Sequence, residues 1–237
     1  VINAGQGIDG TTNQGKITGQ KVYQSIYSAF APDVTGSARA IAISLTDQSQ
    51  GIVGARQRAL RMYAGQDADV SLWAQEFGGR LNVPNKADAG GYSNSGFGFA
   101  MGADGGSVSS GRYGGALTFY TGDTSEKVPR LSKTTSEWYM LTGYQDWRGR
   151  GLFFDSQLSA AYGSLSGKRT IVFADLGATC GTSSNTFCRT AEGKRSSEMV
   201  AGGFTTGEIM NAGGTVFTPQ FAVDGLTMRE EGYTESG

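Results

Sequence analysis

The chain has 237 residues, a formal net charge of −1, 38 glycines and no histidine. A charge so close to zero gives no electrostatic reason to expect nucleic acid as a partner, and without a run of 18 or more apolar residues no transmembrane helix is predicted. The absence of histidine excludes histidine-based catalysis within these residues, and no carboxylate spacing or Cys/His cluster indicates another site, so we expect no catalytic residues, no metal and no cofactor.

Residues 1–33 are polar and glycine-rich, and we interpret them as a leader or linker. Residues 34–63 lack proline and separate, at 100° per residue, into an apolar and a polar stripe, which predicts a helix of about 26 residues. The polar stripe contains Arg39, Asp47, Gln50, Gln57, Arg58 and Arg61, and the apolar stripe contains Ala38, Ile41, Leu45, Ile52, Ala55, Ala59 and Tyr63. The polar face excludes direct contact with lipid, and taken alone the segment favours an ordinary amphipathic helix on a soluble core.

Beyond residue 69 the period of the apolar residues changes from 3.6 to 2, which predicts β-strands. Seven strands are expected, at residues 70–77, 97–104, 113–120, 137–147, 149–163, 196–208 and 216–225. Their connections alternate in length, and the stretches 79–93, 121–135 and 164–195 are the long ones. Long strands with one apolar face and alternating connections are typical of outer-membrane β-barrels, whereas the alternative, a large soluble β-sandwich, would have shorter strands.

The segment "GRGLFFDSQLSAAYG" (149–163) shows the alternation most clearly. Leu152, Phe154 and Leu158 fall on one face, while Asp155 and Gln157 fall on the other. In a barrel the first face meets lipid and the second meets a wet lumen. The residues expected to face lipid are Phe97, Phe99, Leu117, Phe119, Leu152, Phe154, Leu158, Phe217 and Phe221.

Two cysteines, Cys180 and Cys188, are separated by seven residues in "CGTSSNTFC". A metal site would need more ligands, so a disulfide that closes this loop is the favoured interpretation. Such a disulfide would stabilise the protein by roughly 2–3 kcal/mol in the loop-entropy model, and it would indicate an oxidising compartment.

The order of several segments is more specific than any one of them. A polar helix ending in "ARQRALRMY" is followed by "DVSLWAQEFGG" and "GFGFAMGADGG", and later by "FFDSQLSAAYG" and "FTPQFAVDGL". This ordered set, from about residue 34 to the end of the chain, resembles the translocator domain of autotransporters (type V secretion). The last two segments are similar to the long fifth strand and the seventh strand of that domain.

The resemblance implies an all-β transmembrane fold, an antiparallel barrel of about twelve strands in the outer membrane of a Gram-negative bacterium. Residues 67–237 would supply about seven of these strands, residues 34–66 a helix in the lumen, and residues 1–33 a passenger tail or linker. The implied function is to anchor an N-terminal passenger and export it to the cell surface, without enzymatic activity. The implied partners are outer-membrane lipid or detergent, the barrel assembly machinery, periplasmic chaperones and the passenger, with no nucleic acid.

A helix in the lumen would place its polar face against the barrel wall. The expected contacts come from Arg39, Arg56, Arg58 and Arg61 on the helix, and from Asp155, Gln157, Gln220 and Asp224 on the wall.

The sequence departs from the family pattern in two ways. Seven strands leave two open edges, which lipid does not tolerate, so we expect either a polypeptide that continues past Gly237 or a partner chain that closes the barrel. The chain also lacks the Asn-Asn pair at which some members release their passenger. The alternative function is a porin-like or surface adhesin barrel with no role in secretion, although a porin would not need the polar helix.

Overall fold

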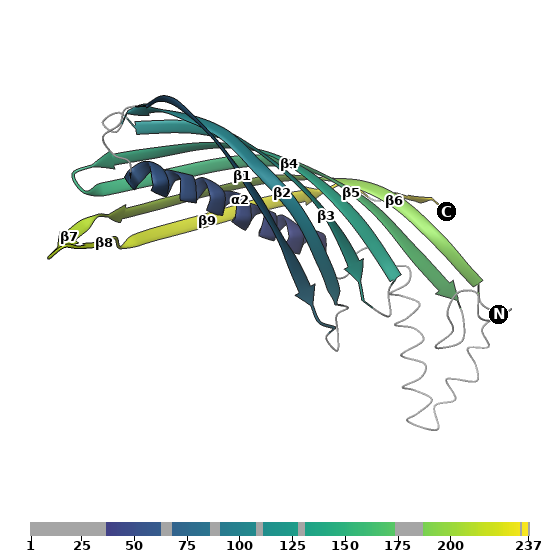
Figure 1. Ribbon diagram of the computed structural model, residues 1–237. Coiled ribbons are helices and arrows are strands. Elements are labelled where there is room, and N and C mark those ends of the chain that lie inside the picture. Colours follow the sequence, from purple (N-terminus) through teal and green to yellow (C-terminus); the bar gives the residue numbers. More distant parts are fainter. Residues whose placement is uncertain are drawn as a thin grey trace.

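A helix and a curved antiparallel sheet make up the computed structural model of the chain (Figure 1). The structure describes residues 37–62, 68–85, 91–107, 111–127, 131–173, 187–232 and 234–236. The helix α2 (Ser37–Met62) lies along the concave face of the sheet. Among the residues described, no helix combines the length and the apolar character needed to cross a bilayer.

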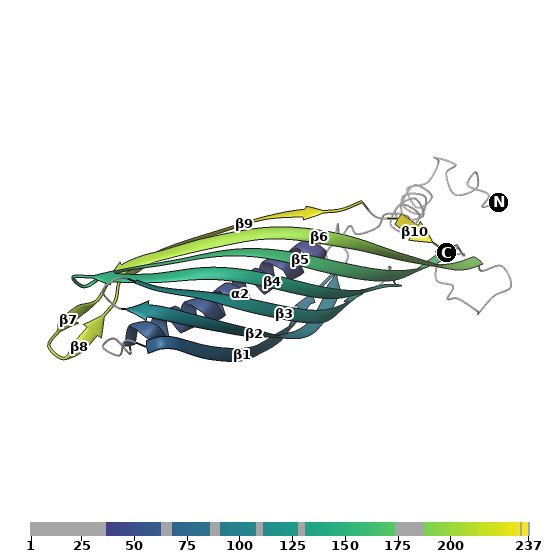
Figure 2. The ribbon, with the colours of Figure 1, turned by 90° about the horizontal axis from the view of Figure 1, so that it is seen from above.

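The long strands follow one another across the sheet in chain order (Figure 2). They are β1 (Ala68–Val83), β2 (Tyr92–Ser107), β3 (Gly111–Glu126), β4 (Leu131–Gly149), β5 (Leu152–Phe173), β6 (Phe187–Glu208) and β9 (Gln220–Glu230). A short strand, β10 (Thr234–Ser236), continues along the same edge of β6 as β9. The predicted antiparallel sheet of seven strands with one N-terminal helix is therefore confirmed, and within the described residues the sheet is open between β1 and β9.

The strands are longer than the apolar alternation predicted, and β5 and β6 each contain 22 residues. The three long connections were therefore predicted too long, because most of the residues in 79–93, 121–135 and 164–195 continue the strands. Near the strand ends the side chains that point outward are polar, such as Ser93 and Ser95 in β2, so no apolar alternation marks these residues. The backbone hydrogen bonds between the strands nevertheless continue through them.

The seventh predicted strand, 216–225, is interrupted. Its first residues form β8 (Thr215–Phe217), which pairs with β7 (Met210–Ala212) in a small hairpin beyond the end of the main sheet (Figure 1). Pairing with β6 begins only at Gln220, after Pro219, whose nitrogen cannot donate to a ladder. The hairpin turns at two residues with positive φ, Gly213 (55°) and Gly214 (85°), as a two-residue type I′ turn requires.

The convex face of the sheet carries the apolar belt. Phe97 is 63% exposed and Leu158 is 65% exposed. The register places Phe99, Phe119, Tyr139 and Tyr162 in one row across β2 to β5. The ring centroids of Phe99 and Phe119 are 5.8 Å apart, and those of Phe119 and Tyr139 are 5.3 Å apart, within the range of favourable aromatic pairs.

The concave face packs against the N-terminal half of α2. Ile41 and Leu45 of the helix are buried in one cluster with Trp138, Met140 and Leu165 of the sheet. The helix contains Gly51 and Gly54, which lower its intrinsic propensity, so its stability comes mainly from this packing rather than from its own sequence.

Glycines on the concave face give inward-pointing rings room to lie along the wall. Trp138 is 1% exposed and lies directly across from Gly163 in the register, and a Cβ atom at Gly163 would be 2.6 Å from the indole ring. Tyr144 lies in the same way across from Gly114. The rings therefore leave space on the concave face for the helix.

Replacing Gly163 with valine is expected to destabilise the protein by about 1–3 kcal/mol, because Trp138 must then move toward the helix that buries it. The measurement is the urea midpoint of unfolding, followed by tryptophan fluorescence. Gly143→Val is the matched control, since an added Cβ on this exposed glycine has no atom within 4 Å. Equal losses in the two variants would contradict the packing argument.

Candidate functional site

The C-terminal half of α2 meets the sheet through polar and charged side chains. Arg56 donates two hydrogen bonds to Asp104 of β2, at 2.8 and 2.9 Å. Tyr144 donates to the same carboxylate at 2.9 Å, and Trp73 donates its indole N–H to the Tyr144 oxygen at 2.8 Å. This chain of contacts fixes the helix to β1, β2 and β4 at once.

A second ion pair lies at the C-terminal end of α2, where Arg61 donates to Asp155 of β5. The guanidinium carbon of Arg61 is 4.1 Å from the centroid of the Phe153 ring, a cation–π arrangement. The register places Asp155 across from Asp146, which in turn lies across from Arg112. Asp155 is buried and Arg61 is mostly so, so the interaction is little screened by solvent.

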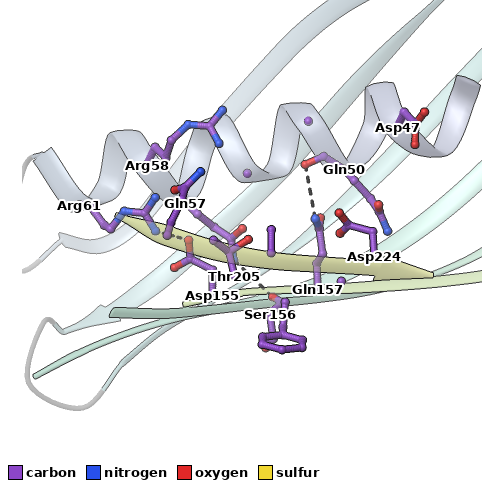
Figure 3. Close-up of a pocket in the computed structure, with 16 residues that line it drawn as sticks. Asp47, Gln50, Gln57, Arg58, Arg61, Asp155, Ser156, Gln157, Thr205 and Asp224 are labelled. Carbon is purple, nitrogen blue, oxygen red and sulfur yellow. Dashed lines mark hydrogen bonds and ion pairs between the residues drawn. The ribbon is translucent and has the colours of Figure 1, made fainter. Parts of the chain in front are cut away.

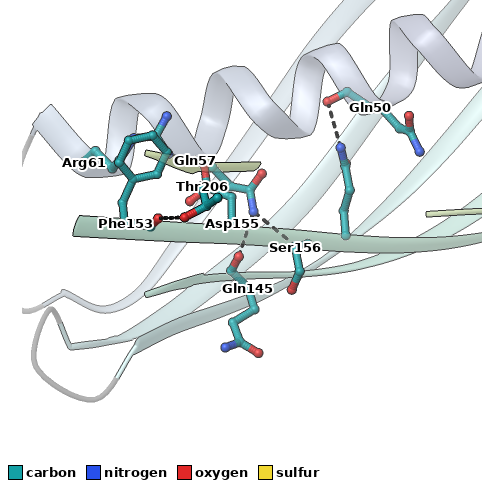
Figure 4. Close-up of polar contacts among 9 residues, drawn as sticks. Gln50, Gln57, Arg61, Gln145, Phe153, Asp155, Ser156 and Thr206 are labelled. Carbon is teal, nitrogen blue, oxygen red and sulfur yellow. Dashed lines mark hydrogen bonds and ion pairs between the residues drawn. The ribbon is translucent and has the colours of Figure 1, made fainter. Parts of the chain in front are cut away.

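Two glutamines of the helix also contact the sheet, Gln57 between these ion pairs and Gln50 two turns before it (Figure 4). The Gln57 amide donates to the backbone carbonyls of Gln145 and Ser156, at 2.8 and 3.3 Å. Gln157 of β5 donates to the backbone carbonyl of Gln50 at 3.5 Å, a long contact. Gln50 and Gln57 are both buried, so this side of the helix is polar and yet packed.

A cleft of about 260 Å³ lies between α2 and strands β5, β6 and β9 (Figure 3). The helix contributes Asp47, Gln50, Gly51, Gly54, Gln57, Arg58 and Arg61, and the sheet contributes Asp155, Ser156, Gln157, Gly203, Phe204, Thr205, Gln220, Ala222 and Asp224. Its lining is mostly polar, and it runs beside the buried contacts of the helix.

Comparison with known proteins gives the family. Residues 72–237 match the family model described as Autotransporter beta-domain. The chain belongs to this family. No match was found among curated proteins.

Two solved structures of autotransporter domains are similar to this chain. The beta domain of the Bordetella autotransporter BrkA is 16% identical, with 71% of this chain and 82% of that chain covered and a TM-score of 0.33. The translocator domain of the autotransporter NalP from Neisseria meningitidis is 10% identical, with 78% and 85% covered and a TM-score of 0.20. The family assignment rests on the match to the family model rather than on these two structures.

In this autotransporter beta-domain the cleft brings together most of the residues predicted to meet in a lumen. All four predicted wall residues line it, as do the predicted polar helix residues except Arg39, which is exposed elsewhere on the helix, and Arg56, which pairs with Asp104 outside the cleft. Of the polar helix residues, Gln50 and Gln57 are buried against the sheet, whereas Asp47 and Arg58 are exposed. Tyr63 lies outside the described residues.

Asp104, which joins the helix to the sheet, is the residue of the candidate site that the sequence analysis missed. Arg56 was expected to contact the wall, but no partner was assigned to it. A signal was present in the alternation of β2. Phe97, Phe99, Met101 and Ala103 fall on one face, so Asp104 falls on the opposite face, which is the concave one.

The residues predicted to face lipid lie on the outside of the molecule. All of them are exposed except Phe119, which is half-buried in the aromatic row; Phe217 lies on the β7–β8 hairpin rather than in the main sheet. Cys180 and the side chain of Cys188 lie outside the described residues, so the disulfide stays a prediction.

Proposed function

We propose that this chain anchors an N-terminal passenger in the outer membrane of a Gram-negative bacterium and exports it to the cell surface. The family supports an outer-membrane translocator role. The observation that carries the finer proposal is that α2 lies along the concave face, packed by an apolar cluster in its N-terminal half and held by two ion pairs in its C-terminal half, while the convex face is apolar. In a closed barrel this helix would occupy the lumen, which a simple porin would leave open.

The proposed orientation follows from the two faces. The convex belt would contact lipid, the concave face would contact the helix and water, and residues 1–33 would connect the helix to the passenger outside the cell. The β4–β5 turn and the β7–β8 hairpin would lie in the periplasm. Folding in the membrane would involve periplasmic chaperones and the barrel assembly machinery, and the domain itself would act without catalysis, metal or cofactor. A Cys180–Cys188 disulfide would stiffen a surface loop.

Surface accessibility of the chain in intact Gram-negative cells tests this proposal. An epitope placed before Val1 is expected to be removed by protease added to intact cells, while the protein fractionates with the outer membrane. The same epitope inserted between Gly213 and Gly214, at the tip of the β7–β8 hairpin, is the control and should be protected. Protection of both epitopes in an outer-membrane protein would instead indicate a porin-like barrel without secretion.

A further inference from the structure

Three exposed lysines gather on the convex face, toward the ends of β4, β5 and β6 that lie opposite the β7–β8 hairpin (Figure 1). Lys133 of β4 lies directly across from Lys168 of β5. Lys194 of β6 lies across from Ser166, which makes it a diagonal neighbour of Lys168. Direct and diagonal neighbours have Cβ atoms about 5 Å and about 7 Å apart, so the three ammonium groups form one lysine cluster.

The carboxylates nearby do not neutralise the lysine cluster. Glu192 pairs with Lys168, with 2.8 Å between nitrogen and oxygen, and Asp123 of β3 accepts a hydrogen bond from a neighbouring threonine. Lys133 and Lys194 form no ion pair with another residue that the structure describes. Like charges directly across from each other destabilise a sheet, so the Lys133–Lys168 pair is unfavourable unless an anion lies between the two side chains.

The lysine cluster lies well beyond the apolar belt. On β5, Tyr162 is followed on the outward face by Ser164 and Ser166, and only then by Lys168. Six residues of strand span about 20 Å, or about 15 Å along the bilayer normal for strands tilted by about 40°. The headgroup layer of a phospholipid leaflet is only about 5–7 Å thick. The cluster is therefore farther from hydrocarbon than the phosphate of a phospholipid would be.

The same strands carry an apolar groove on the belt side of the cluster. It has a volume of about 730 Å³, and its lining includes Leu117, Tyr139, Leu141, Tyr162 and Val200. Along β4, β5 and β6 the convex surface thus changes from an apolar groove to hydroxyl groups and then to cations. Acyl chains, sugar hydroxyls and phosphates follow one another in the same order in a phosphorylated glycolipid.

We infer that this surface binds a phosphorylated glycolipid of the outer leaflet, with acyl chains in the groove and sugar-borne phosphates on the lysine cluster. The inference rests on the proposed function, because the proposed orientation places the lysine ends of the strands at the cell surface. Lysine binds phosphate as a point charge. A phosphate between Lys133 and Lys168 would replace their mutual repulsion with attraction to a common anion.

Binding of the full chain, in uncharged detergent micelles with EDTA, to fluorescently labelled rough lipopolysaccharide tests the inference. This probe carries phosphates on its sugars, and EDTA removes divalent cations that could bridge them to carboxylates. Lys133→Gln and Lys194→Gln should each weaken binding about fivefold, the effect of one unit charge about 4 Å from an anion in a water-like medium. The same glycolipid without its phosphates should bind more weakly than either variant binds the intact one.

Arg150→Gln is the matched control, because Arg150 is an exposed cation at the β4–β5 turn, at the other end of the same strands. It should leave the affinity unchanged. Equal binding of the dephosphorylated glycolipid or of phosphatidylglycerol, or an equal loss in Arg150→Gln, would overturn the inference and leave the proposed function standing. The proposed function is decided separately, since protection of both epitopes in intact cells would overturn it whatever the micelle experiment shows.

Discussion

Replacing Arg61 with alanine is expected to destabilise the protein by about 3 kcal/mol, because the change leaves Asp155 buried without its partner. The two side chains are only 9% and 6% exposed, so water cannot readily take over the lost contact. Arg148, whose positive charge also acts on Asp155, limits the loss. The C-terminal end of α2 should detach first, since its N-terminal half is held by the separate apolar cluster around Trp138.

The loss is measured as the shift in the urea midpoint of unfolding in lipid vesicles or detergent. Arg58→Ala is the control, since Arg58 is exposed, lies three positions before Arg61 and has no ion pair among the described residues. It should change stability by less than about 0.5 kcal/mol. Equal losses of stability in the two variants would mean that the positive charge of the helix in general, and not the Arg61–Asp155 pair, holds the helix end.

Leu158→Arg is expected to lower the stability of the membrane-inserted protein by about 2–4 kcal/mol, the range for arginine on the lipid face near the bilayer midplane. Leu158 lies near the middle of the apolar part of β5 (residues 152–162), points away from the helix and is 65% exposed. The measurement is the folding equilibrium in lipid vesicles. This is a test of the proposed lipid contact, because a convex face surrounded by water would tolerate the substitution.

Ser166→Arg supplies the matched control for that experiment. Ser166 lies on the same strand and the same face, eight residues further along, where the outward side chains have become polar. Arginine there should have little effect. A small effect at both positions would mean that the convex face does not contact the bilayer core.

Much of the fold could be predicted because two periodicities dominate the sequence. The change from a helical to a two-residue period divides α2 from the sheet, and the alternation in 152–162 assigns each side chain of β5 to a face. Strand ends could not be predicted in this way. Pairing of the backbone is independent of side-chain polarity, so Ser93 and Ser95 continue β2 without any apolar signal.

The site was harder to predict because the helix surface is not divided simply into apolar and polar halves. A helical wheel groups Gln50 and Gln57 with Asp47 and Arg58, since all are polar. On the concave wall the backbone carbonyls of Gln145 and Ser156 accept hydrogen bonds from Gln57, so this glutamine is buried against the sheet just as Leu45 is. The partner of Arg56 depends on the register of α2 against β2, which no local pattern contains.

The aromatic row on the convex face also fixes how the sheet is inclined. The row that joins Phe99, Phe119, Tyr139 and Tyr162 continues through the register to Glu198 of β6 and Arg229 of β9, both exposed. If this row lay parallel to the plane of a bilayer, those charges would sit at the same depth as the phenylalanine rings. In the proposed membrane orientation the row would instead climb from hydrocarbon into the headgroup layer as it passes from β2 to β9, so the strands would slant across the bilayer, as staggered pairing requires in a closed barrel.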